Sequence, residues 1–98
     1  MGYSKRGSVG WGEDLYIIWC PEAGVVKIGR SCNCERRFKQ ISLSCPFLHM
    51  ELAATFPSSG WAEAACHRAL HDKSCGREWF RTPREDAVNL VNSILTLP

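Results

Sequence analysis

The apolar positions of the chain form short unbroken runs and longer stretches with helical spacing. The runs LYIIWC (15–20) and VVKIG (25–29) are rich in β-branched and aromatic residues. Between them, PEAG (21–24) has the proline and glycine of a turn. This order predicts a hairpin whose first strand is buried on both faces. A third strand is expected at residues 47–56, where apolar and polar residues alternate in part.

Residues 31–42 predict a short helix. Phe38 and Ile41 are three positions apart and share one face of that helix. Ser31 or Asn33 can cap its first turn, because a short polar side chain accepts a hydrogen bond from a free backbone N–H there.

Two further helices are expected in the second half of the chain. Residues 61–73 are rich in alanine, the strongest helix former. Residues 82–95 have apolar positions at helical spacing. Thr82, Pro83 and Glu85 at the start of that segment predict a capping box with proline at the first helical position.

The order of these elements predicts an α+β fold. It consists of a three-stranded, mostly antiparallel sheet packed against about three helices, with residues 76–82 as a short extended connection. Residues 14–98 are expected to form a single domain. Residues 1–13 are rich in Gly, Ser and charge, and are expected to be a flexible arm.

Composition agrees with a single folded domain. The 98 residues are 45% hydrophobic and include four tryptophans, and the net charge of +2 excludes a polycation. The charge is concentrated locally, since residues 27–39 hold five basic side chains and one acidic one, Glu35. The basic residues are Lys27, Arg30, Arg36, Arg37 and Lys39. Such a patch is either a phosphate-binding surface or a solvated face.

The six cysteines raise the question of a disulfide framework. The N-terminus has no apolar signal core, and no apolar run reaches the length of a membrane span. We therefore expect a cytoplasmic protein with reduced thiols and no membrane contact. A zinc site is the alternative, although its ligands would not have a standard spacing. Its candidate ligands are Cys32, Cys34, His67, His71 and Cys75.

The segment 61–73 carries a polar stripe. Glu63, His67 and His71 are four residues apart and fall on one side of an otherwise apolar helix. A carboxylate with histidines one and two turns away is typical of a metal or acid–base site, with Glu63 as the metal ligand. The alternative is a solvent-facing stripe.

Lys27 stands in a strand that otherwise looks buried. Gly29 follows it closely, which allows a tight turn or the close approach of another group. Tyr16 lies on the paired strand and can share a face with Lys27, depending on register. Arg30 and Ser31 stand at the start of the predicted helix, where backbone N–H groups favour an anion. The alternative for Lys27 is a side chain that extends from an edge strand into solvent.

The two neighbouring arginines of the helix have different environments. Arg37 is one turn from Ile41 and borders the core, whereas Arg36 is one turn from Gln40 on the solvent side. Arg37 is therefore the candidate for a fixed guanidinium. A phosphate-binding surface on this segment, such as one that contacts the backbone of a nucleic acid, would include Lys27, Arg30, Ser31, Arg36 and Lys39.

These motifs together resemble the GIY-YIG nuclease superfamily. LYI with Tyr16 resembles the first motif, and KIG (27–29) the second; an arginine, Arg37, and a glutamate, Glu63, follow in later helices. KIGRS, Glu63 with His67, and EWF (78–80) are most similar to the branch found in phage open reading frames and fungal meiotic genes. The resemblance spans residues 15–80.

The resemblance implies a metal-dependent endonuclease that hydrolyses nucleic-acid phosphodiester bonds, with DNA as the substrate. Tyr16, Lys27, Arg37, Glu63 and His67 would be the catalytic residues. It also implies that Glu63 binds Mg²⁺ or Mn²⁺ and that a homodimer would make paired cuts. A catalytically inactive module that binds DNA or a protein partner in phage–host conflict is the alternative.

The chain departs from the superfamily pattern at several positions. Lys27 replaces the tyrosine of the second motif, so it is either a base or a charge stabiliser, or catalysis has been lost. The first motif lacks its glycine, with Asp14 before Leu15. Asn89 is the nearest match for a late asparagine.

Overall fold

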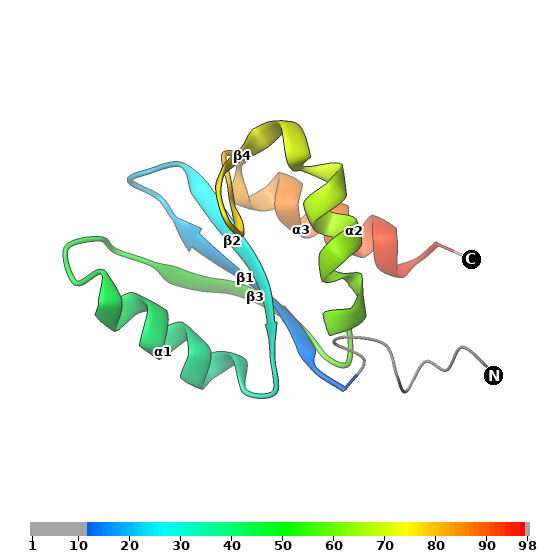
Figure 1. Cartoon of the computed structure of the whole chain (residues 1–98), viewed down its shortest axis with the longest axis horizontal. Coiled ribbons are helices and arrows are strands. Elements are labelled where there is room, and N and C mark those ends of the chain that lie inside the picture. The colour runs from blue at the N-terminus through cyan, green and yellow to red at the C-terminus, as the bar shows by residue number, and fades with distance from the viewer. Residues whose placement is uncertain (1–11, 98) are drawn as a thin grey trace.

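The computed structural model describes residues 12–97, which fold as a mixed sheet and helix domain (Figure 1). Its strands are β1 (Asp14–Cys20), β2 (Val25–Ser31), β3 (Glu51–Phe56), β4 (Ser74–Gly76) and β5 (Trp79–Phe80). Its helices are α1 (Cys34–Ser44), α2 (Glu63–Ala69) and α3 (Arg84–Leu95), with 3₁₀ turns η2 (Gly60–Ala62) and η3 (His71–Lys73). The α+β class is confirmed.

The sheet has five strands in the order β3-β1-β2-β5-β4, and every pair is antiparallel. The prediction of three strands was therefore wrong. The segment expected as an extended connection pairs with β2, placing Trp79 opposite Lys27 and Phe80 opposite Val26. This pairing satisfies the second edge of β2, which a three-stranded sheet would have left open.

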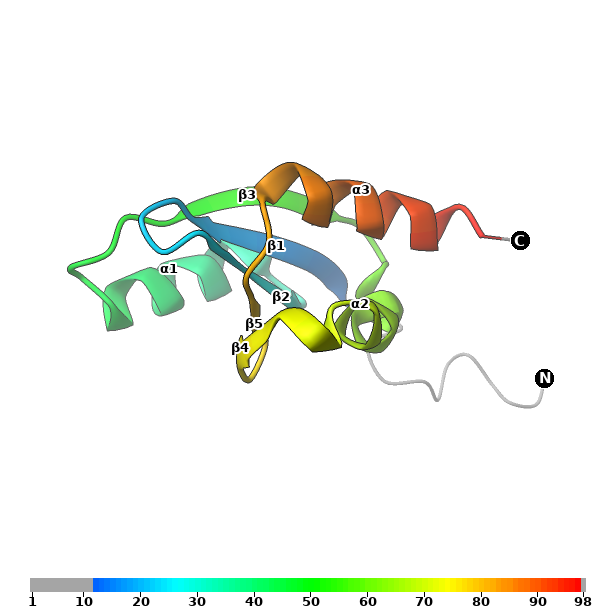
Figure 2. The ribbon, with the colours of Figure 1, turned by 90° about the horizontal axis from the view of Figure 1, so that it is seen from above.

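The two faces of the sheet carry separate cores. Figures 1 and 2 show α1 on one side and α2 with α3 on the other. Leu15 and Ile17 of β1 pack toward α2 and α3, whereas Tyr16 and Ile18 pack with residues of α1. All four side chains are at most 1% exposed, which confirms that β1 is buried on both faces.

Two helices differ from their predicted bounds. α1 begins at Cys34, and the Asn33 side chain caps it by accepting a hydrogen bond from the Arg36 N–H at 3.0 Å. Ser31 ends β2 instead. The helix expected at 61–73 ends at Ala69, because the chain turns there and leads into β4 and β5, which join the sheet. The Arg81 N–H donates to the Lys73 carbonyl at 2.8 Å and ties the end of this turn to the residue after β5.

The predicted capping box at Thr82 was wrong. Pro83 is the N-cap of α3, its backbone is extended, and no side chain caps the helix. Thr82 is buried, and its backbone N–H bonds the Phe80 carbonyl at 3.1 Å. Glu85 still lies in the first turn, where a negative charge is favourable.

All six cysteines are free thiols in the structure. Cys20, Cys34 and Cys66 are buried within the two cores. Burial is the main cause that raises the pKa of Cys66, to about 11, so this thiol is protonated at neutral pH and acts as a packing residue. No helix within residues 12–97 combines the length and apolar character of a membrane span.

Candidate functional site

The register of the β1–β2 hairpin places Tyr16 and Lys27 on the same face of the sheet. Tyr16 lies opposite Gly29, and Lys27 lies opposite Ile18. A Cβ at Gly29 would be 2.4 Å from the Tyr16 Oη and 2.6 Å from its Cζ. The Tyr16 ring therefore lies across the glycine, which confirms close approach as the role of Gly29.

Tyr16 is held as a neutral phenol. Its pKa is raised to about 12, mainly by burial and then by the charge of Glu78, although a hydrogen bond and the charge of Arg37 oppose the shift. At neutral pH the hydroxyl therefore donates or accepts hydrogen bonds and does not act as a tyrosinate. The same interactions place Arg37 and Glu78 beside it.

Five charged side chains line a cavity of about 250 Å³, which we call the site cavity. They come from segments that are far apart in the sequence: the start of β1, β2, α1, α2 and the connection between β4 and β5. The lining residues are Glu13, Arg30, Arg37, Glu63 and Glu78. Two of the predicted catalytic residues, Arg37 and Glu63, are thus brought to one cavity.

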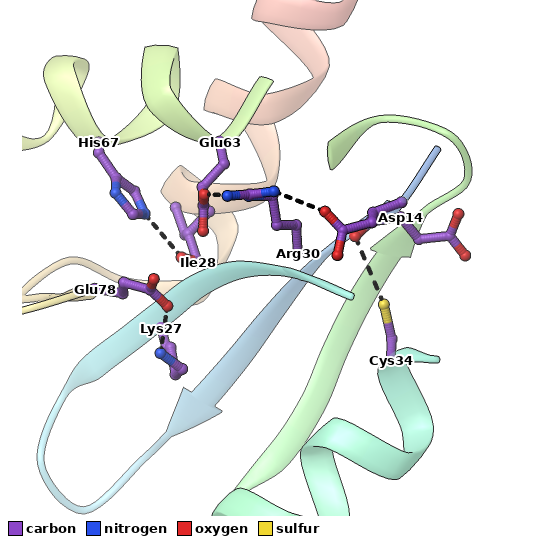
Figure 3. Close-up of polar contacts among 9 residues, drawn as sticks. Asp14, Lys27, Ile28, Arg30, Cys34, Glu63, His67 and Glu78 are labelled. Carbon is purple, nitrogen blue, oxygen red and sulfur yellow. Dashed lines mark hydrogen bonds and ion pairs between the residues drawn. The ribbon is translucent and has the colours of Figure 1, made fainter. Parts of the chain in front are cut away.

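Arg30 bridges two carboxylates across this cavity (Figure 3). Its Nε donates to Glu63 Oε1 at 2.8 Å and its Nη1 donates to Glu13 Oε1 at 2.7 Å. The hydrogen bond to Glu63 is the main cause that raises the pKa of Arg30. Arg30 was expected to contact phosphate, but here its first role is to hold two acids in place.

Glu13 was not identified from the sequence, which placed it in the N-terminal arm. Its carbonyl also accepts a hydrogen bond from the Gly60 N–H at 2.8 Å. It therefore belongs with the folded part of the chain. The rest of the predicted arm, residues 1–11, lies outside the described residues.

Lys27 adjoins the site cavity through Glu78. Its Nζ donates to Glu78 Oε1 at 2.5 Å and lies 5.9 Å from the centre of the Trp79 ring. The side chain of Lys27 is 14% exposed, so it is not a solvent-extended lysine at a sheet edge. The sequence analysis noted Glu78 only as part of EWF (78–80), and the structure pairs it with Lys27.

His67 contacts the backbone of the central strand. Its Nε2 is 2.8 Å from the carbonyl oxygen of Ile28 (Figure 3). Its ring centre lies 5.1 Å from that of Phe80. It does not line the site cavity. His71 lies beyond the end of α2 in η3 and is exposed, so the predicted stripe of three residues is broken.

The carboxylates of the site cavity suit a hard cation. Glu63 bonds Arg30 through Oε1, while its Oε2 has no protein partner within residues 12–97. Glu13 and Glu78 add further carboxylate oxygens to the same lining. No group of three His, Cys, Asp or Glu side chains in the described part of the chain is arranged to hold a metal ion. Glu63 with Glu13 or Glu78 would be the residues to hold a cation such as Mg²⁺ or Mn²⁺, with waters completing its coordination.

A second cavity of about 160 Å³ adjoins the start of α1. Its lining includes Ser31, Arg36 and Arg37, so Arg37 belongs to both cavities. The Ser31 hydroxyl accepts a hydrogen bond from the Asn33 N–H at 3.0 Å. Lys39 is two residues after Arg37, which places the two side chains about 160° apart around the helix axis. Lys39 therefore lies on the opposite side of α1 from Arg37 and does not line either cavity.

Comparison with known proteins gives one match. The model of the T5orf172 domain matches residues 14–95, nearly all of the described chain. Neither the curated proteins nor the solved structures give a match.

Proposed function

The chain belongs to the T5orf172 domain family, a nuclease-related domain of phage open reading frames, and we propose that it is a metal-dependent endonuclease acting on nucleic acid. One observation carries the proposal. Arg37 of α1 and Glu63 of α2 come from opposite sides of the sheet and line one cavity, with the Tyr16 hydroxyl beside Arg37. A phosphate clamp and a carboxylate for a divalent cation are the two charged parts that phosphodiester hydrolysis requires.

Arg37 is the group that would bind the scissile phosphate. It is exposed, and no carboxylate pairs with it within residues 12–97. Its planar guanidinium can donate two parallel hydrogen bonds to phosphate oxygens. Tyr16 would fix the orientation of Arg37 and, as a neutral hydroxyl, can also hold a water or a phosphate oxygen.

Glu63 would hold the cation, with Glu13 or Glu78 at the same cavity. When bound, Mg²⁺ or Mn²⁺ supplies charge stabilisation and lowers the pKa of a bound water. Arg30 fixes the direction of the Glu63 carboxylate through one oxygen and leaves the other to face the cavity. His67 would anchor α2 to β2 through the Ile28 carbonyl and so set the position of Glu63.

Lys27 is proposed to act as a charge and not as a base. Its Nζ donates to Glu78 Oε1 at 2.5 Å, and the two side chains form an ion pair. In this role Lys27 orients Glu78 and adds positive charge close to Tyr16. Where the superfamily has a tyrosine, this chain would thus have a cation that completes an ion pair.

The catalytically inactive nucleic-acid-binding module is the second candidate. It is favoured by the Arg30 bridge, because the guanidinium already pairs with both Glu13 and Glu63 and offsets one of their two negative charges. A cation would have to share or displace this contact.

A cleavage assay tests the two candidates. Wild type is incubated with supercoiled duplex, flap and single-stranded DNA, with Mg²⁺, Mn²⁺ or chelator. Cleavage that needs the metal and is lost in Glu63→Gln, but kept in Glu22→Gln, supports the endonuclease. Glu22 is the control because it is exposed in the β1–β2 turn. DNA binding without cleavage of any substrate would leave the inactive module as the function.

Calorimetry with Mn²⁺ tests the metal site independently of activity. Wild type should bind, and Glu63→Gln should bind markedly more weakly. Equal binding by both proteins would remove Glu63 from the site.

Lys27→Met and Lys27→Tyr test the role of Lys27. If Lys27 acts through its charge, Lys27→Met lowers cleavage at all pH values and leaves the shape of the pH profile unchanged. Glu78→Gln should then produce a similar loss, whereas the exposed Lys73→Met should not. A pH profile that loses its rising limb only in the Lys27 variants would instead assign the base role.

A further inference from the structure

The turn after α1 presents a large aromatic side chain to solvent. Phe47 is 94% exposed, and two leucines near it are also exposed, Leu43 at 77% and Leu48 at 42%. The Leu48 N–H bonds the Cys45 carbonyl at 3.1 Å, which closes a four-residue turn with Pro46 and Phe47 at its centre. The turn is thus ordered by its own hydrogen bond, and Phe47 stands at its tip.

Residues on both sides of Phe47 line an apolar cavity, whereas the Phe47 side chain points away from it into solvent. Cys45, Leu48 and Met50 line this cavity of about 260 Å³ together with Trp79. Phe47 does not line it. The exposed ring therefore contributes little to the core, and its apolar surface is available to a partner.

The outer face of α1 leads to this tip. Arg36, Lys39 and Leu43 have spacings of three and four residues, so they form one stripe along the solvent side of the helix. Residues 35–50 contain Arg36, Arg37 and Lys39 and one acidic residue, Glu35, which lies one turn before Lys39, whereas the other nine acidic residues lie elsewhere in the chain. The positive excess of the whole protein is therefore located on this segment.

The stripe is continuous with the candidate site. Arg36 lines the second cavity together with Arg37, which also lines the site cavity. From Arg37 to Ser44 the helix rises about 10 Å, or about three base-pair steps of duplex. Figures 1 and 2 place the α1–β3 connection at the end of the molecule away from the C-terminus.

We propose that the outer face of α1 and the Phe47 tip form a nucleic-acid-binding surface that extends from the candidate active site. Phosphates lie along Arg36 and Lys39, and the Phe47 ring stacks on a base about three to five nucleotides from the phosphate held by Arg37. Charge decides the partner, because Arg36, Arg37 and Lys39 outnumber the single acid Glu35 on this segment and so attract a polyanion, and an aromatic ring has a face for any base. The inference rests on the proposed function in one respect, which is that the nucleic-acid strand runs from the phosphate held by Arg37 toward Phe47. The surface itself can be tested by DNA binding without any measurement of cleavage.

Fluorescence anisotropy with a short labelled DNA in chelator measures this binding without cleavage. Phe47→Ser should raise the Kd about 5- to 30-fold and leave the salt dependence unchanged, because it removes stacking and no charge. Lys39→Gln should weaken binding less and reduce the salt slope by about one. Leu97→Ser and Lys73→Gln are the matched controls, since Leu97 is 69% exposed near the C-terminus and Lys73 lies in η3.

The melting temperature of Phe47→Ser should equal that of wild type, which excludes misfolding. An unchanged Kd in Phe47→Ser, with weaker binding in Arg37→Ala, would overturn the surface and leave the endonuclease proposal standing. Two results together would support both the binding surface and the endonuclease proposal. Glu63→Gln should lose cleavage but bind DNA as tightly as wild type, and Phe47→Ser should bind DNA more weakly than wild type.

Absence of any nucleic-acid binding by wild type would overturn both. Two other results would overturn this surface by assigning it to another partner: a Phe47-dependent dimer in sedimentation, or Phe47-dependent binding to anionic vesicles without an effect on DNA.

Discussion

The basic residues of β2 and those of α1 are close in sequence but differ in their surroundings. Lys27 and Arg30 on β2 are both bonded to carboxylates. Arg36 and Lys39 on α1 have no ion pair within residues 12–97. β2 is the central strand, so its polar side chains meet α2 and the β4–β5 connection, whereas the outer face of α1 meets solvent.

The difference shows that a cluster of basic residues in sequence can serve two purposes. The paired cations fix the geometry of carboxylates, because a partly buried charge needs a partner. The unpaired ones remain available to phosphates. Arg37 lies at the boundary: it contacts Tyr16 and lines the site cavity but has no carboxylate partner.

The largest expected effect separates Arg37 from its neighbour Arg36. Arg37→Lys keeps the charge but removes the planar two-point donor and the contact with Tyr16, so cleavage should fall by about 100- to 1,000-fold. Arg36→Lys should change cleavage by less than about threefold, because solvated contacts to phosphate tolerate either cation. Rates measured under single-turnover conditions give the comparison. Equal losses in the two variants would remove the distinction between a fixed and a free arginine.

Tyr16 gives the next largest effect, because its pKa of about 12 lies well above its ordinary value of 10.0. The folded state holds this proton more tightly than the unfolded state, so the free energy of unfolding should fall as the pH rises from about 10 to about 12. Ultraviolet titration of tyrosinate should show one of the two tyrosines, Tyr3 and Tyr16, ionising near pH 12. Tyr16→Phe should abolish that step. If both tyrosines ionise near pH 10 in the folded protein, Tyr16 is not buried beside Glu78.

Gly29→Ala tests the contact beneath Tyr16. The added methyl would overlap both Oη and Cζ of Tyr16, so the free energy of unfolding should fall by about 1–3 kcal/mol. Tyr16→Phe should not restore it, since Cζ remains within 2.6 Å of the new methyl. Gly12→Ala is the control, because no heavy atom lies within 4 Å of a Cβ there. Chemical denaturation of the four proteins gives the result.

The sequence predicted those parts of the fold that depend on local pattern. The burial of β1 on both faces, the hairpin with its turn, and the Asn33 cap all follow from residues that are neighbours in the chain. The two short strands β4 and β5 could not be predicted in this way. β5 is stabilised by pairing with β2, some fifty residues earlier, and β4 by pairing with β5, and not by propensity in segments of two and three residues.

The candidate site divides in the same way. Arg37 and Glu63 were identified because the order of the motifs resembles a known superfamily, and the cavity contains both. Glu13 and the pairing of Lys27 with Glu78 were missed, because ion pairs between residues 17 or 51 positions apart leave no periodic signal in the sequence. The loss of His71 from the stripe follows from a helix end that tertiary pairing determines.

The smallest expected effect compares Arg30 with Lys39 directly. Arg30→Gln leaves Glu13 and Glu63 facing each other with side chains 28% and 15% exposed, so the free energy of unfolding should fall by about 1–2 kcal/mol. Lys39→Gln removes an unpaired surface charge and should change it by less than about 0.5 kcal/mol. Adding Glu63→Gln to Arg30→Gln should recover part of the loss, since it removes one of the two unpaired carboxylates. Chemical denaturation of the single and double variants shows whether Arg30 stabilises the two carboxylates of the site cavity. Equal free energies of unfolding for Arg30→Gln and Lys39→Gln would mean that the Arg30 and Lys39 side chains are equally solvated.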